Sequence, residues 1–194
     1  MKLNLDIKVP SSQDWLHAVL NHFDTFLQDH ADCERKASAM AMSFVAKYPD
    51  RKEIIPELIE TALEELEHFQ EVYAIMEKRN INLPASMAKD PYLQALLPYC
   101  RSDRDNRFMD RLLIASIAET RGAERFKMVA DNLQDEDLAK FYKKLWTSEA
   151  KHGHIFVKMA LHYFSEEEVY PRLEELLQKE SEIIGQLEIR SALH

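Results

Sequence analysis

The chain has 194 residues, of which 46% are hydrophobic and 30% are charged, and its formal net charge is −9. This length suits one domain with a single buried core. The three glycines, Gly122, Gly153 and Gly185, are too far apart for a dinucleotide-binding fingerprint or a P-loop, so both of these nucleotide-binding classes are excluded. Two cysteines are too few for a disulfide scaffold or a four-thiolate metal site, and no long apolar run predicts a signal peptide or a membrane span. We therefore expect a cytoplasmic protein.

Apolar residues recur with helical spacing in four long segments, from Ser11 toward Val45, from Asp50 to about Arg79, from Asp103 or Asp105 to about Ala130, and from about Asp137 to about Tyr163. Short turns separate the members of each pair, and the residue before Pro49 is pushed out of the helical region. An irregular connection with three prolines, residues 81–101, joins the two pairs and has room for short helices. Residues 165–194 follow as a more polar helical tail.

Two antiparallel helical hairpins joined by one long crossover predict an all-α fold, the ferritin-like four-helix bundle, with additional short helices and a C-terminal helical tail. We expect one domain over residues 1–194, with the bundle core at residues 13–164 and the tail at residues 165–194.

Two segments follow the spacing Glu-x-x-His, namely Glu65 with His68 and Glu149 with His152. Residues three apart face the same side of a helix, so each pair can direct a carboxylate and an imidazole at one metal ion. A single pair of this kind in an acidic chain is more often a surface glutamate beside a histidine, so the interpretation depends on whether further ligands lie opposite each pair.

The hairpin turns supply that test, because residues equally distant from a turn lie side by side. Glu34 and Glu65 each lie 15 residues from the turn of the first hairpin. Glu119 and Glu149 lie 14 and 15 residues from the turn of the second hairpin. Each hairpin is therefore predicted to bring one glutamate opposite a Glu-x-x-His pair.

Glu124 competes with Glu119, because its immediate neighbours resemble those of Glu34. It lies five residues nearer the turn, which is about 7.5 Å along a helix and more than a metal–ligand bond can absorb. The sequence therefore favours Glu119. Glu64 is a weaker alternative ligand beside His68.

Four inward carboxylates and two imidazoles would strongly destabilise an empty helical core, and divalent cations remove that cost. Oxygen-rich ligands without thiolates suit iron or manganese, and this ligand arrangement is that of di-iron carboxylate proteins. We predict a dinuclear metal site, with a metal-free bundle as the alternative. The predicted ligands are Glu34, Glu65, His68, Glu119, Glu149 and His152.

Small residues flank the lone glutamates, among them Ala115, Gly122 and Ala123 around Glu119. They either leave room for O2 and an organic substrate beside the metals or simply let two helices approach closely.

The positive charge is concentrated in the middle of the chain, since residues 78–127 carry a net charge of +4 and the remainder carries −13. Arg101, Arg104, Arg107 and Arg111 recur there at spacings of three and four, which predicts one basic stripe if the segment is helical. Arginine suits phosphate, so the stripe is a candidate nucleic-acid contact. The alternative is a solvated helix face paired with neighbouring aspartates.

Seven stretches of the sequence resemble the MiaE family of tRNA hydroxylases: residues 29–37, 41–45, 48–51, 64–69, 110–113, 119–126 and 148–152. The resemblance covers residues 13–164, and the C-terminal tail matches only loosely.

The resemblance implies an O2-dependent non-haem di-iron monooxygenase that hydroxylates the isopentenyl group of 2-methylthio-N6-isopentenyladenosine, next to the anticodon of tRNA. It implies two iron ions, held by the six residues predicted above, and an external electron-transfer protein as a partner. An iron-storage or peroxide-scavenging protein of the ferritin or rubrerythrin type would use the same ligands and is the alternative.

Overall fold

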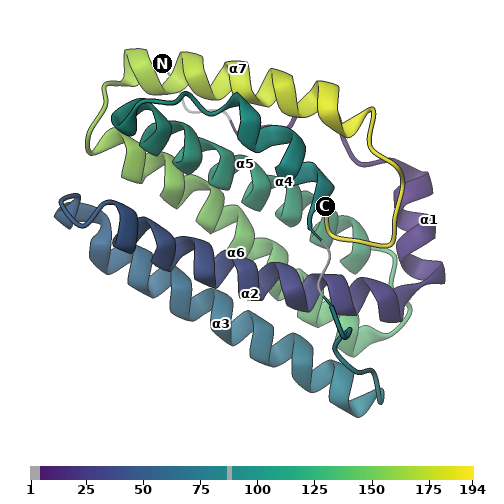
Figure 1. The fold of residues 1–194 in the computed structure, drawn as a ribbon. Coiled ribbons are helices and arrows are strands. Elements are labelled where there is room, and N and C mark those ends of the chain that lie inside the picture. Colours follow the sequence, from purple (N-terminus) through teal and green to yellow (C-terminus); the bar gives the residue numbers. More distant parts are fainter. Residues whose placement is uncertain (1–4, 87–88) are drawn as a thin grey trace. The chain divides into compact units, whose positions relative to one another are not determined.

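The computed structural model describes residues 5–86 and 89–194, and every regular element in that part of the chain is a helix (Figure 1). This confirms the predicted all-α class. The elements are α1 (Gln13–Asn21), α2 (Phe23–Lys47), η1 (Lys52–Ile54), α3 (Ile55–Lys78), α4 (Pro91–Leu96), η2 (Leu97–Tyr99), α5 (Arg104–Ala130), α6 (Glu136–Leu161) and α7 (Glu166–Ile184). None of the helices in the described residues is long and apolar enough to span a membrane.

The contacts divide the chain into two compact units. The α5–α7 unit contains residues 5–16, Lys89–Ile189 and His194, and the α2–α3 unit contains residues 17–86 and Arg190–Leu193. Each unit is built on one long antiparallel hairpin. The expectation of one domain over the whole chain stays a prediction.

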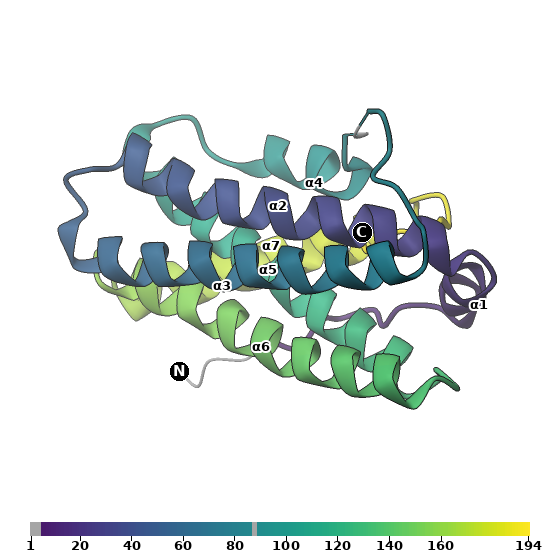
Figure 2. The same cartoon turned by 90° about the horizontal axis from the view of Figure 1, so that it is seen from below.

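In the α2–α3 unit, α2 and α3 run side by side (Figure 2). Phe26 and Phe44 of α2 and Leu58 and Val72 of α3 are buried along the hairpin. Burying a side chain of this size contributes about 1.5–3 kcal/mol, so the apolar stripe of each helix fixes its rotation about its own axis. The carboxylate and imidazole residues described below occupy the same buried faces.

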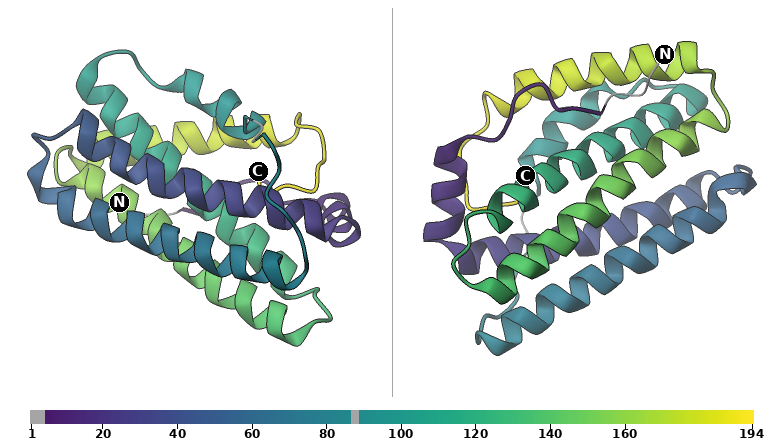
Figure 3. Two further views of the ribbon diagram at one scale, coloured as in Figure 1. Left: turned by 60° about the horizontal axis from the view of Figure 1, so that its bottom comes forward. Right: turned by 180° about the vertical axis from the view of Figure 1, so that it is seen from behind.

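The α5–α7 unit places α6 and α7 against α5 (Figure 3, right). Its helices begin at well-formed N-caps. Asp103 accepts a hydrogen bond from the backbone N–H of Asn106 at 3.0 Å, and Asp135 accepts one from Leu138 at 3.1 Å. Ser165 and Glu168 form a reciprocal capping box at the start of α7. These caps set where α5, α6 and α7 start, and therefore the height of every side chain along them.

The structure differs from the prediction in two elements. Residues 13–47 form two helices instead of one, because His22 leaves the helical region with φ −131° and ψ 48° while backbone hydrogen bonds continue across it. The expected helical tail over residues 165–194 is helical only to Ile184. Gly185 caps that helix, and glycine has low helix propensity, which favours an end at this point.

Candidate metal centre

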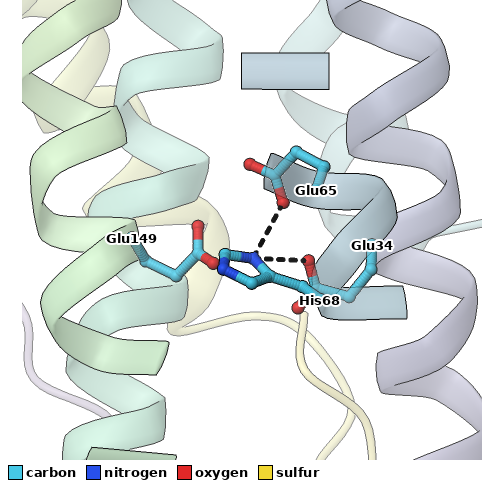
Figure 4. Close-up of side chains that lie close together, drawn as sticks. All are labelled: Glu34, Glu65, His68 and Glu149. Atoms are coloured by element: carbon cyan, nitrogen blue, oxygen red, sulfur yellow. Dashed lines mark ion pairs between the residues drawn. The ribbon is translucent and has the colours of Figure 1, made fainter. Parts of the chain in front are cut away.

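The α2–α3 unit brings Glu34, Glu65 and His68 together (Figure 4). His68 Nδ1 lies 3.6 Å from Glu34 Oε2 and 3.4 Å from Glu65 Oε2, and one donor atom from each residue lies within 4.8 Å of the other two. All three side chains are buried. We call this set the first half-site.

The register of α2 and α3 explains this grouping. Glu65 and His68 are one turn apart on α3 and so face the same way. Ser38, one turn after Glu34, donates from Oγ to the backbone carbonyl of Ala62 at 2.7 Å. That bond holds the two helices in register within one turn of the predicted ligand residues.

A second half-site lies in the α5–α7 unit and consists of Glu119 from α5 with Glu149 and His152 from α6. One donor atom from each lies within 4.8 Å of the other two, and His152 Nδ1 lies 3.4 Å from Glu149 Oε2. The two half-sites therefore have the same composition, although they share no sequence beyond the Glu-x-x-His spacing.

Close approach of α5 and α6 supports the second half-site. Ser116 donates from Oγ to the backbone carbonyl of Gly153 at 2.7 Å. A Cβ atom on Gly153 would lie 2.7 Å from Thr120 Oγ1, which is closer than real Cβ contacts allow. Glycine next to His152 therefore lets the helices meet at the height of the predicted ligand residues.

His30 is a functional candidate that the sequence reasoning missed. It is fully buried, and its Nε2 lies 2.6 Å from Glu34 Oε1. A histidine that binds the outer oxygen of a metal-ligating carboxylate orients that carboxylate and tunes its basicity. The signal was present in the sequence, because His30 precedes Glu34 by four residues on one helix.

Glu124, the competitor of Glu119, has another role in the structure. Its carboxylate accepts hydrogen bonds from Ser11 N at 2.8 Å and from Ser11 Oγ at 2.7 Å, and Arg121 Nη1 lies 3.4 Å away. It therefore ties the segment before α1 to α5. Glu64, the other alternative, is half-buried on α3.

The chain is similar to known proteins over nearly its whole length. A family model described as tRNA-(MS[2]IO[6]A)-hydroxylase (MiaE) matches residues 2–194. The chain belongs to the MiaE family. The curated tRNA 2-(methylsulfanyl)-N(6)-isopentenyladenosine(37) hydroxylase of Pseudomonas putida is 33% identical over 176 residues, which cover 90% of this chain and 84% of that protein. The Salmonella typhimurium protein of the same name is 30% identical over 136 residues, which are 70% of this chain and 49% of that protein.

A solved structure also resembles this member of the MiaE family. It is a Synechococcus protein described as Protein 43 with aldehyde deformylating oxygenase activity. The TM-score is 0.89 at 29% identity, and the match covers 95% of this chain and 92% of that chain. The expected ferritin-like fold and the resemblance to the MiaE family are thus both confirmed.

Within this MiaE-family chain, the predicted arginine stripe is shorter than expected. Arg101 lies before α5, and its guanidinium binds Asp110 at 2.7 and 3.0 Å. Arg172 binds the same carboxylate at 2.9 and 3.0 Å. Burial raises the pKa of Asp110, but the hydrogen bonds from both arginines outweigh it and hold the pKa below its ordinary value. Only Arg104, Arg107 and Arg111 remain as a stripe on α5.

Two further arginines of the basic segment are buried in the MiaE-family fold. Arg121 donates from Nε to Glu180 Oε1 at 2.8 Å, and the hydroxyl of Tyr92 donates to the same oxygen at 3.2 Å. The guanidinium of Arg125 lies 4.7 Å from the ring centre of Trp15. Burial and the neighbouring Arg121 lower the pKa of Arg125 to about 10. These two charges therefore hold α4, α5, α7 and the N-terminal segment together and add little to the surface charge.

Proposed function

We propose that this protein is an O2-dependent di-iron monooxygenase that hydroxylates the isopentenyl group of 2-methylthio-N6-isopentenyladenosine next to the anticodon of tRNA. The observation that carries the proposal is the MiaE-family match over residues 2–194, in a chain whose two hairpins each assemble two glutamates and a histidine. The relatives named above supply the substrate class.

The donor set of each half-site fits iron. In each group two carboxylates, which are hard ligands, lie within 4.8 Å of an imidazole, which also suits iron, and no cysteine takes part in either group. Buried carboxylates at this spacing repel one another, and a divalent cation removes that repulsion. We propose that Glu34, Glu65 and His68 hold one iron, that Glu119, Glu149 and His152 hold a second, and that the two form one di-iron centre.

Hydroxylation of an allylic C–H bond offers no proton acidic enough for a side-chain base to take, so the metals must supply the oxidising chemistry. Two ferrous ions bound at these residues would activate O2 with two electrons from outside. The balance is R–H + O2 + two electrons + two protons giving R–OH and water, which implies an electron-transfer protein as a partner. The task of the polypeptide is to hold the ligands, exclude water and position the substrate carbon.

Some free space is present next to the second half-site. Gly122 is buried and lies one turn after Glu119, yet a Cβ atom on it would meet no heavy atom within 4 Å. Ala115 and Ala123 keep the same part of α5 narrow. This supports the interpretation of the small residues as room for substrate.

The tRNA is proposed to reach the protein through basic side chains. Bases of an anticodon loop are single-stranded and can be turned out into a protein pocket. We propose that Arg104, Arg107 and Arg111 contact phosphates. Arg101 is not included, because its guanidinium forms an ion pair with Asp110. A tRNA substrate also implies a cytoplasmic location.

The test is nucleoside analysis of tRNA from a strain that lacks the hydroxylase, after incubation with purified protein, a chemical or enzymatic reductant and O2. We expect the hydroxylated nucleoside to appear, with about two irons per chain. Glu119→Ala should abolish product and lower the iron content, whereas the matched variant Glu124→Ala should keep its iron. Iron uptake in bulk, or peroxide consumption without any change in the tRNA, would favour the storage or scavenging alternative.

A further inference from the structure

The outward face of α6 is basic in an otherwise acidic protein. The segment Leu138–Leu161 has five lysines, all exposed, and its single acidic residue is the buried Glu149. We call these lysines the α6 ridge: Lys140, Lys143, Lys144, Lys151 and Lys158. Figure 3 (right) shows α6 in green beside α5.

The ridge is straight and regularly spaced. Lys144, Lys151 and Lys158 are seven residues apart, so they share one face and follow one another at about 10.5 Å. Lys140 stands at the start of the ridge, 3.9 Å from Glu136 and Asp137. Beyond it, positive charge continues along about four turns of the helix.

Other helices present the opposite charge. Helix α3 has seven glutamates and one lysine, and α7 has seven glutamates, one arginine and one lysine. On α5, Arg121 and Arg125 are buried. A polyanion is therefore attracted to α6 and repelled by α3 and α7.

A pocket of about 490 Å³ opens beside the ridge, within the same unit. Helix α6 contributes Trp146 and His154, α5 contributes Thr120 and Lys127, and residues 5–7 complete the wall. This volume lies within the range of small-molecule pockets, about 300–1,000 Å³. Trp146 is half-buried, so the pocket has one large aromatic surface.

The chemistry of the pocket favours a base over a phosphate. Asp6 and Glu124 also line it, and their carboxylates repel phosphate, whereas the Asp6 carboxylate can accept a hydrogen bond from an amino group of a base. An indole stacks on any unstacked base, and lysines bind phosphates without regard to sequence. The pocket and the ridge thus offer complementary contacts to one strand of RNA.

We infer that single-stranded RNA binds along α6, with its phosphates on the α6 ridge and one unstacked base in the pocket against Trp146. This rests on the proposed function in so far as the natural RNA is an anticodon loop. It adds a contact surface distinct from Arg104, Arg107 and Arg111.

The ridge is tested by binding of a fluorescently labelled, unmodified RNA hairpin at several salt concentrations. Lys144→Glu with Lys158→Glu should weaken binding about tenfold or more, and should reduce the slope of log affinity against log salt by about 1.4–1.8. The matched control is Lys52→Glu with Lys78→Glu, which makes the same change in net charge on exposed lysines of the α2–α3 unit. It should bind within about twofold of the wild type.

The pocket is tested with Trp146→Leu, which keeps apolar volume but removes the stacking surface, and Trp146→Phe, which restores an aromatic ring. The leucine variant should bind the hairpin loop about 5- to 150-fold more weakly, and phenylalanine should recover much of the loss. Neither variant should change binding of a blunt RNA duplex, which has no unstacked base. Thermal unfolding and iron content of each variant show whether it is folded.

Unchanged binding by the ridge variant overturns the inference, and so does an equal loss in the lysine control, since affinity would then follow net charge alone. A Trp146→Leu variant that loses duplex and hairpin binding equally overturns the assignment of the pocket. These outcomes are separate from the proposed function, because the assay involves no turnover. If the wild-type protein hydroxylates no tRNA but the ridge variant still loses RNA binding, only the proposed function is refuted.

Discussion

Gly153 and Gly122 form a matched pair for testing how closely α5 and α6 must approach. Both lie inside long helices, where alanine is about 1 kcal/mol more favourable than glycine. At Gly122 a Cβ atom meets no heavy atom within 4 Å, so Gly122→Ala should show the full gain. At Gly153 the Cβ would lie 2.7 Å from Thr120 Oγ1 and 3.3 Å from the carbonyl oxygen of Ser116.

Ordinary contact begins at 3.4 Å, so Gly153→Ala must displace a side chain and part of the α5 backbone. Overpacking of this kind costs about 1–3 kcal/mol. The two alanine variants should therefore differ by about 1–3 kcal/mol, and for a chain of this size that corresponds to about 2–12 °C in Tm. Gly122→Ala should be the more stable.

Thermal unfolding of the iron-free proteins, followed by circular dichroism, measures the difference without stabilisation by bound metal. Removing the obstructing hydroxyl with Thr120→Ala should make Gly153→Ala much less costly, whereas Thr120→Val, which keeps an atom of similar size at that place, should not. Equal melting temperatures for Gly122→Ala and Gly153→Ala would refute the reasoning, because they would show that α5 and α6 have room to spare.

Three further predictions concern buried polar contacts. Asp110→Asn should destabilise the protein by about 2–4 kcal/mol near neutral pH. The folded-state pKa of Asp110 is lowered, so the stability difference between wild type and variant should be complete above about pH 5. It should disappear as the pH falls below about 4 and through that lowered pKa. Urea unfolding at several pH values measures it. His30→Gln should weaken iron binding about 10- to 100-fold in chelator competition. The control is His17→Gln, which changes an exposed histidine and should leave iron affinity unchanged. Equal iron affinities of the two variants would contradict the positioning role of His30. Arg121→Met should lower the free energy of unfolding by about 3–5 kcal/mol, measured in urea, because it leaves Glu180 buried without its cation. Adding Glu180→Leu should recover much of that loss. A double variant as unstable as the single one would contradict this explanation of the loss.

Much of the fold follows from local features of the sequence. Proline, capping residues and apolar spacing gave the long helices to within a few residues, because each feature acts within one or two turns of the chain. The same local rules group Glu65 with His68, and Glu149 with His152. The distance of a residue from the hairpin turn adds one glutamate to each pair. In the structure Glu34 and Glu119 each lie within 4.8 Å of the pair to which they were assigned.

Other features depend on residues far apart in the sequence, and local patterns do not reveal them. Arg121 was counted as part of a basic segment, but its partner Glu180 lies 59 residues away on another helix, so the burial of both charges was not visible. Arg101 joined a helical stripe by spacing alone, whereas its contact with Asp110 needs the chain to turn before α5. The break between α1 and α2 at His22 could not be predicted, because no proline or glycine lies near it in the sequence.

Each half-site is confined to one hairpin, and this has a consequence for the order of events during synthesis. His68, the last donor of the first half-site, precedes Glu119 by 51 residues. At about 5–20 residues per second, the ribosome needs roughly 3–10 s to add that length. Hairpins have low contact order and close within microseconds to milliseconds, so α2 and α3 can pair before Glu149 and His152 of α6 have been added. The nascent chain then carries three gathered donors, and if they hold iron as proposed, metal loading can begin while translation is still under way.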